Sequence, residues 1–465
     1  MLTVKGRYLF AFLASVGNMI CLLGRDSMRI ATLEMKMELN LTEADNSNIL
    51  SKELTKIILN NIKFLGGYSY GMLGTMLLGG PLADTLGGKW VLVLVTLVSS
   101  SCTLLVPLLA PLSTPALVCV QVVSGLGGGL VVPALSSMIA RWEPVSETGK
   151  LATIIYTGSQ LSMVFSSIFT GYISYSYNWQ LAFYLLGSVP LLWTIPWLLL
   201  VDDDPSKSRL TSELERDMLR EETQSSDFRP SLRNIPILRI FSSSGVIAVI
   251  AANIGVSWAN SHTSLLMPQF IDGLGYPIFT TSILSTISFI GTSVIGLISP
   301  HVFSLIRRYN ISTTVARKLS CSICLVGFSI LTFPTAFIDQ ESYPILIIVL
   351  GTFSCSLLGF NLVGAWGNPQ DISPNYVGTI MGIMGFFNEI TRSVVLHTKT
   401  LITSQVVDDE VWPILFILAS GVTVVANGVY LMLGTSETQE WDSLSESKEN
   451  LSDEKNPKVF RFHTI

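Results

Sequence analysis

Residues 79–92 have the sequence GGPLADTLGGKWVL, a glycine-rich stretch between two long apolar runs. Gly87 and Gly88 permit a tight turn, because glycine adopts backbone conformations that other residues rarely enter. Asp84 can cap the helix that follows, where its negative charge meets the positive end of the helix dipole. The stretch therefore predicts a tight polar turn between two apolar helices, with Lys89 at the start of the second one.

The composition of the chain is that of a membrane protein. Of its 465 residues, 49% are hydrophobic and 13% are charged, whereas soluble domains contain about 25% charged residues. The six cysteines lie in apolar stretches, and Cys321 and Cys324 lack the histidine or second cysteine pair that a zinc site needs. We expect no metal, cofactor or nucleic-acid partner. Because no acids and histidines have hydrolytic spacing, we do not expect an enzyme.

Apolar stretches near the roughly 20 residues that cross a bilayer occur twelve times. Their centres are Phe12, Met76, Thr96, Val123, Leu161, Leu191, Gly255, Phe289, Cys324, Ile348, Ile383 and Ile417. Six precede and six follow a polar interval, which indicates an all-α membrane protein of two bundles. The expected organisation is an N-terminal six-helix bundle at 1–201, a cytoplasmic linker at 202–240, a C-terminal six-helix bundle at 241–433 and a disordered cytoplasmic tail at 434–465.

The basic residues between the spans set the orientation, since lysine and arginine concentrate in cytoplasmic loops. Most of them fall on the side that carries Lys89, the interval 202–240 and the pair Arg307 and Arg308. We therefore expect that side to be cytoplasmic. The sequon at Asn40 lies on the opposite side, where N-glycosylation occurs, so Asn40 is the expected glycosylation site.

Three stretches carry a resemblance to known proteins. In 79–92, the residues Gly80, Asp84, Gly87 and Lys89 match the G-x-x-x-D-x-x-G-[RK]-[RK] pattern of the major facilitator superfamily, with Gly88 where a basic residue is common. The stretches 125–174 and 367–383 resemble the anion:cation symporter family within it, which includes sialin, sodium/phosphate cotransporters and vesicular glutamate transporters. The resemblance implies the major facilitator fold. It also implies that Asp84 and Lys89 are gating residues at the cytoplasmic face, with Asp84 pairing across the two bundles.

The resemblance also implies an anion anchor in the first span. Arg25 falls on the arginine of the family pattern R-x-N-x-x-x-A, with Ser27 in place of the asparagine and Ala31 retained. A guanidinium offers a planar, always-charged fork that suits carboxylate or phosphate. Arg29 lies one turn further along the same face. It either contacts the substrate or, as we favour, pairs with Glu34 or a loop acid.

Five other polar residues within the spans are candidate substrate-binding residues that could line the site by hydrogen bonding. They are Tyr70, Gln121, Tyr156, Ser159 and Asn361.

Two departures from the family affect ion coupling. Gln121 and Gly128 stand where span four of the family carries an arginine and a glutamate, so the acid tied to proton coupling in sialin-like members is absent. We expect transport to be driven by sodium or membrane potential, or to be facilitative. His262 and Glu389 are the only candidate proton sites in place of that acid. Glu389 and Arg392, three residues apart, are either part of the substrate pathway or a structural pair. The possible coupling residues are therefore His262, Glu389 and Arg392.

These features predict a secondary active or facilitative transporter of an organic anion or inorganic phosphate that works by alternating access. The partners expected are a small anionic substrate, the lipid bilayer and, as an optional coupling ion, sodium. The membrane is the plasma membrane or an endolysosomal or vesicle membrane. The alternative is a non-transporting, receptor-like or scaffolding membrane protein derived from the family, because the span-four residues are missing.

Overall fold

The computed structural model describes most of the chain. The residues described are 5–38, 67–76, 78, 79, 82, 87–112, 114–144, 150–206, 208–222, 236–340, 342–374, 376–403, 405 and 408–442. Within these ranges the regular secondary structure is helical. The predicted glycosylation site Asn40 and the predicted gating residue Asp84 lie outside the described residues.

The N-terminal bundle is built from the first six spans. Its helices are α1 (Gly6–Glu38), a helical segment at 67–76, α3 (Gly88–Leu109), α4 (Thr114–Gly128), α5 (Val131–Trp142), α6 (Lys150–Ser176) and α7 (Trp179–Leu200). The fourth span is divided into α4 and α5 at Gly129 and Leu130, which form a turn.

The C-terminal bundle follows after α8 (Glu213–Glu222) and α9 (Ile237–Ser242). Its helices are α10 (Ser244–Ser261), α11 (Met267–Gly273), α12 (Ile278–Arg308), α13 (Thr313–Thr332), α14 (Pro344–Leu357), α16 (Val377–Thr403) and α17 (Asp408–Leu433), with the short α15 (Asn368–Ile372) before α16. A π-helical turn at His262–Leu266 joins α10 to α11.

Ten helical segments of the described chain are long and apolar enough to cross a membrane. The other two expected spans are the segment that begins at residue 67, which is described only in part, and α16, which has 27 residues and contains Glu389, Arg392 and Lys399. The twelve-span prediction is consistent with this count, and the chain is an integral membrane protein of many spans.

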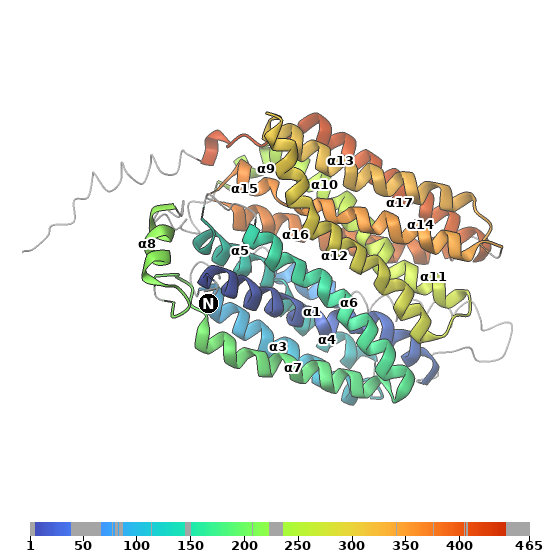
Figure 1. The fold of residues 1–465 in the computed structure, drawn as a ribbon. Coiled ribbons are helices and arrows are strands. Elements are labelled where there is room, and N and C mark those ends of the chain that lie inside the picture. Colours follow the sequence, from blue (N-terminus) through green and yellow to red (C-terminus); the bar gives the residue numbers. More distant parts are fainter. Residues whose placement is uncertain are drawn as a thin grey trace, which may run out of the picture.

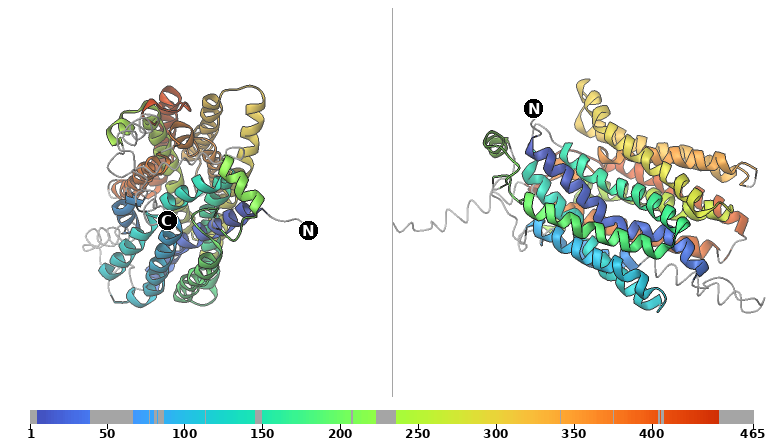
Figure 2. Two further views of the ribbon diagram at one scale, coloured as in Figure 1. Left: turned by 90° about the vertical axis from the view of Figure 1, so that its left-hand side faces the viewer. Right: turned by 60° about the horizontal axis from the view of Figure 1, so that its bottom comes forward.

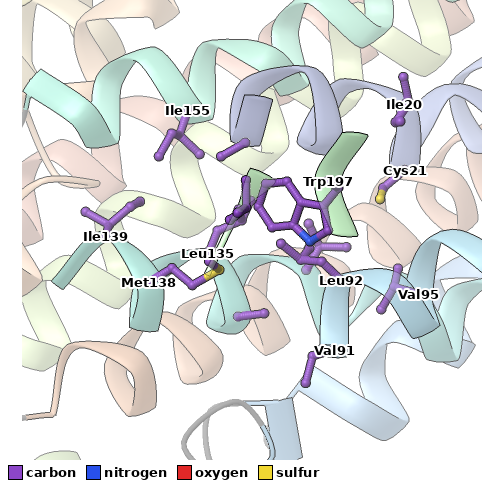
Figure 3. Packing of buried hydrophobic residues seen from close by; sticks show 14 of the residues in the cluster. Ile20, Cys21, Val91, Leu92, Val95, Leu135, Met138, Ile139, Ile155 and Trp197 are labelled. Carbon is purple, nitrogen blue, oxygen red and sulfur yellow. The ribbon is translucent and has the colours of Figure 1, made fainter. Parts of the chain in front are cut away.

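The core of the N-terminal bundle is closed by aromatic side chains near the predicted cytoplasmic end. Phe10 of α1 stacks on Trp142 of α5 with ring centroids 4.4 Å apart, and Trp197 of α7 stacks on Trp193 at 4.9 Å. Figure 3 shows Trp197 among aliphatic side chains such as Leu92 and Leu135, which come from α3 and α5. Close van der Waals packing of these side chains holds four helices together, because lipid tails are as apolar as the core and supply no hydrophobic driving force.

The two bundles lie side by side, and α6 packs along α12 at the boundary between them (Figure 1). Close packing is possible because small residues meet there: a Cβ on Gly171 of α6 would lie 2.2 Å from Ser282 Oγ of α12. A second boundary contact joins α5 to α16. The helix α8 lies beside the beginning of α1 (Figure 2), at the predicted cytoplasmic end.

Gly87, which directly precedes α3, has the backbone conformation that a glycine turn predicts. Gly87 has a φ of +85°, which favours glycine. Lys89 donates its backbone N–H to Asp203 Oδ1 over 2.8 Å, and its Nζ lies 3.0 Å from Asp202 Oδ1. Because Asp202 follows α7, Lys89 pairs inside the N-terminal bundle and makes no ion pair with described residues of the other bundle. Its predicted gating role is not supported by this contact.

Residues 434–442 correct the expectation that the tail is disordered from residue 434. Ser436 donates to Asn368 Oδ1 over 3.0 Å, and the backbone N–H of Gln439 donates to the carbonyl of Ile372 over 2.9 Å. Trp441 is 8% exposed and packs on Tyr376 with ring centroids 6.0 Å apart. These residues are ordered because they satisfy the polar groups of α15 and the loop after it.

Candidate anion site between the bundles

Three charged residues of α1 form one cluster in the middle of the first span. Asp26 is fully buried and accepts from Arg25 Nε over 2.9 Å, from Arg29 Nη2, and at its other oxygen from Ser162 Oγ of α6 over 2.8 Å. The spacings i, i+1 and i+4 place both guanidiniums within reach of one carboxylate. Asp26 thus makes two arginines tolerable in a membrane helix, because unpaired charges there are costly.

Arg29 therefore differs in its partner from the sequence prediction. It pairs with Asp26, three residues earlier, whereas the side chain of Glu34 and the loop after α1 lie outside the described residues. This partner supports the structural interpretation of Arg29 over substrate contact. Asp26 was missed in the sequence analysis. Its position, next to Arg25 and three residues before Arg29, predicts an ion pair with both arginines.

Arg25 keeps its terminal nitrogens for another ligand. Its guanidinium carbon lies 5.4 Å from the ring centre of Tyr68, a cation–π contact, and Nε is held by Asp26. The described residues offer Nη1 and Nη2 no hydrogen-bond partner, and the side chain is 11% exposed. Tyr68 and Asp26 thus orient a guanidinium fork whose outer edge is unoccupied, as an anion anchor requires.

One face of α16 is turned toward the N-terminal bundle. A Cβ on Gly382 would lie 3.0 Å from the carbonyl oxygen of Met76, and one on Gly385 would lie 2.2 Å from Met76 Cε. Glu389 and Arg392 continue this line at intervals of four and three residues, the spacing of one helix face. Both charged residues therefore lie on the face that meets the second span.

The second span presents a matching line of side chains. Tyr68, Met72 and Met76 are four residues apart, are at most 5% exposed and form one buried cluster. Tyr68 lies about 12 Å from Met76 along the second span. Because this span and α16 run in opposite directions, Glu389 and Arg392 lie beyond Gly385 on the same side of Met76 as Tyr68. Electrostatic interactions of Glu389 with Arg25, and of Arg392 with Arg25 and Tyr68, agree with this arrangement.

Glu389 and Arg392 do not form a self-contained pair. No ion pair within 4.0 Å joins them, although Glu389 is only 7% exposed. Glu389 Oε2 is buried and has no hydrogen-bond partner among the described residues. The guanidinium of the partly exposed Arg392 makes no hydrogen bond to a described residue. The structural-pair alternative is therefore not supported, and both groups remain available at the boundary between the bundles.

The other predicted lining residues lie at different depths. Gln121 is buried on α4 beside Gly67, next to Tyr68. Tyr156 hydrogen-bonds Ser136 at 2.7 Å and packs edge-on against Trp366 of the other bundle at 5.7 Å. Tyr156 precedes Ser162 by six residues, which places it about 9 Å nearer the cytoplasmic end.

Three further predicted residues are not brought to Arg25 by any described contact. Ser159 donates to the carbonyl of Tyr156, one turn back on its own helix. Asn361 has a buried Oδ1 without a hydrogen-bond partner, in the 3₁₀ turn after α14. Tyr70 is 43% exposed, whereas Tyr68 faces Arg25. Tyr68 is the aromatic residue that the sequence prediction missed.

Gly128 has a clear packing reason to lack a side chain. A Cβ there would lie 1.9 Å from Tyr68 Oη and 2.6 Å from Tyr68 Cζ. Tyr68 therefore occupies the space that an acid at position 128 would need. The buried acids of this site are Asp26 on α1 and Glu389 on α16.

His262 lies apart from this cluster. It begins the π-helical turn after α10, is 4% exposed, and faces Phe416 with ring centroids 5.3 Å apart. It lines a small cavity inside the C-terminal bundle with Thr263, Thr335 and Ser354. Its Nε2 has no hydrogen-bond partner among the described residues. Of the three predicted coupling residues, the structure brings together Glu389 and Arg392 and leaves His262 within one bundle.

With two helical bundles and a charged cluster at their boundary, this chain falls in the class of membrane transport proteins. The chain belongs to the Major Facilitator Superfamily, whose family model matches residues 40–396. Within it, the chain is similar, at 25–27% identity, to members of the anion:cation symporter group.

Sialin from Homo sapiens is 27% identical over 94% of this chain and 91% of its own length. The chloroplastic ascorbate transporter of Arabidopsis thaliana is 26% identical over 93% of this chain and 75% of its own. Among solved structures, the proton:xylose symporter XylE with a bound sugar has a TM-score of 0.70 at 16% identity, covering 95% of this chain and 100% of that one. The predicted fold and family are thereby confirmed.

Proposed function

We propose that this protein carries a small organic anion or inorganic phosphate across a membrane by alternating access, with Arg25 as the anion anchor. The observation that carries this proposal is the state of Arg25. Its Nε is fixed by Asp26, its face rests on Tyr68, and its terminal nitrogens have no described partner. An arginine held in this way is ready to bind a carboxylate or phosphate through two parallel hydrogen bonds.

The position of Arg25 suits a carrier. The anchor is on the N-terminal bundle, and Glu389 and Arg392 lie on the α16 face that meets the second span, close enough to interact electrostatically with Arg25. A ligand bound there contacts both bundles, so it can favour one relative position of the bundles over another. The names of relatives support the anionic class: sialin, an ascorbate transporter and a sodium-dependent phosphate transport protein.

The test is uptake by the purified full chain in proteoliposomes. The panel contains phosphate, sialate, urate, glutamate and nucleotides, each with and without sodium and pH gradients. Arg25→Gln should abolish uptake of whichever anion is transported. The control is Arg308→Gln, because Arg308 is exposed at the end of α12 and makes no described contact with the site. Full uptake by Arg25→Gln would contradict the proposal.

The driving force is the second part of the proposal. Because position 128 holds glycine and its space is filled by Tyr68, the span-four acid is absent, and we expect sodium, membrane potential or simple facilitation. Concentration of substrate by a pH gradient alone would contradict this. No uptake of any anion, with normal folding, would favour the receptor-like alternative.

A further inference from the structure

Arg392 is the charged group of the site that the proposed function does not yet use. It lies on the α16 face that meets the second span, one turn beyond Glu389. None of its nitrogens has a hydrogen-bond partner among the described residues. Arg392 is partly exposed. A guanidinium without a protein partner in a membrane-spanning helix is costly, and such residues mark ligand pathways.

The charges of the site are unequal. Among the described residues, Arg25, Arg29 and Arg392 supply three positive charges, and Asp26 and Glu389 supply two negative ones. Asp26 holds Arg29 and the inner edge of Arg25. The boundary therefore has two guanidiniums whose terminal nitrogens have no described partner, one from each bundle, and the carboxylate of Glu389 one turn before Arg392 on α16. This leaves one net positive charge.

We propose that Arg392 is a second anion-binding residue, and that Glu389 restricts the site to anions with a single negative charge. This inference rests on the proposed function and names the substrate class for the same site. One monoanion between Arg25 and Arg392 neutralises the cluster. A dianion leaves an uncompensated negative charge, which is unfavourable where water is excluded. Inorganic phosphate would enter in its singly charged form.

Glu389 acts in this arrangement as an internal counter-ion. Its carboxylate interacts favourably with both Arg25 and Arg392, while Asp26 holds the inner edge of Arg25. The substrate competes with it for both guanidiniums. Removal of its charge should therefore strengthen anion binding in general and shift the preferred charge from one to two.

The test uses a matched pair of probes, succinate with two carboxylates and its half-amide succinamate with one, at a pH where both are fully ionised. Binding is read from the rise in melting temperature of the purified full chain with probe concentration, because a ligand that binds only the folded state stabilises it. The wild type should bind succinamate about tenfold or more tightly than succinate. Glu389→Gln should reverse this order.

Arg392→Gln should weaken succinamate binding by about tenfold to a hundredfold, the effect of one charged hydrogen bond. Its melting temperature without ligand should not fall, since the substitution removes a cation that repels Arg25. A merely structural residue would show the opposite pattern. Arg392→Lys keeps the charge but loses the fork, so it should lie between the wild type and Arg392→Gln, and Arg308→Gln should match the wild type.

Three results would overturn the proposal: unchanged succinamate affinity in Arg392→Gln, an unchanged ratio of the two probes in Glu389→Gln, or no stabilisation of the wild type by succinamate. The proposed function is tested separately by Arg25→Gln. If Arg25→Gln abolishes uptake while Arg392→Gln leaves binding unchanged, only the further inference fails.

Discussion

Arg25 and Arg29 stand four residues apart on α1, and the carboxylate of Asp26 holds both. Two arginines on one face of a membrane helix repel each other, and each loses its hydration. Asp26 offsets the cost of repulsion and lost hydration by accepting from Arg29 Nη2 and from Nε of Arg25. The result is a division of labour, in which Arg29 is structural and Arg25 keeps its outer edge for a ligand.

Asp26→Asn should therefore destabilise the protein strongly. Removal of one partner from a buried ion pair leaves an unpaired charge and costs about 3–5 kcal/mol. The matched control is Asp202→Asn, because the Lys89–Asp202 pair is partly exposed, with Asp202 35% accessible, and should cost about 1 kcal/mol or less. Thermal unfolding of the purified variants measures both effects.

A second substitution tests the reason for the Asp26 effect. Arg29→Met, added to Asp26→Asn, removes the cation left unpaired and should recover part of the lost stability. If the double variant is less stable than Asp26→Asn alone, charge pairing is not what Asp26 provides.

At the scale of elements, the helix α8 lies against the beginning of α1. Glu215 of α8 accepts from the backbone N–H of Gly6 over 2.8 Å and of Arg7 over 3.2 Å, and its Oε1 lies 3.6 Å from Arg7 Nη1. A carboxylate at a helix N-terminus satisfies free N–H groups and interacts favourably with the helix dipole. Part of the predicted linker is thus fastened to the first span by Glu215, and Met218 Sδ of α8 also accepts from Arg7 Nη1 over 3.9 Å.

Glu215→Gln should release α8 from the N-terminal bundle. Hydrogen bonds to a charged group are worth about 1.5–3 kcal/mol, so the open state should become about tenfold more populated or more. Limited digestion with trypsin, which cuts after Arg209 and Arg216 when α8 opens, measures this. Glu213→Gln is the control, because Glu213 is exposed in the first turn of the same helix. Equal digestion rates for the two variants would contradict the role of Glu215.

The same kind of local fastening holds the chain end against the C-terminal bundle. Asn368, fully buried, donates to Tyr430 Oη over 3.0 Å and to the carbonyl of Thr435 over 3.1 Å. Truncation after residue 434 should lower the melting temperature, because it removes Ser436 and the packing of Trp441 on Tyr376. Truncation after residue 442 is the control and should leave stability unchanged. Equal melting temperatures would show that residues 435–442 contribute nothing.

For the whole molecule, the sequence predicts what depends on short stretches of chain. Span positions follow from local length and apolarity, the turn at Gly87 follows from one glycine, and Arg25 follows from a short motif. The sequence did not predict that Tyr68 meets Arg25 or that Glu389 faces the other bundle, because these contacts depend on how two helices far apart in sequence pack together. Asp26 is different, since its spacing to both arginines was local and was overlooked.

Alternating access requires the two bundles to separate on the cytoplasmic side of Arg25, and the contact of Met76 with Gly382 is placed to report this. Gly382 lies seven residues before Glu389, about 10 Å nearer the predicted cytoplasmic end, and its Cβ position is 3.0 Å from the Met76 carbonyl. This proximity allows a disulfide between cysteines at the two positions after a small backbone adjustment. The pair Met76→Cys and Gly382→Cys, with the exposed Cys119 replaced by serine, should cross-link on oxidation.

Cross-linking should stop anion uptake in proteoliposomes, and a reductant should restore it, because the bundles must part at this contact for the site to reach the cytoplasm. Each single cysteine variant serves as a control and should keep its uptake under oxidant. Transport at the uncross-linked rate by fully cross-linked protein would mean that the bundles do not separate between Met76 and Gly382. The path from Arg25 to the cytoplasm would then have to avoid the boundary on the cytoplasmic side where α16 meets the second span and α5.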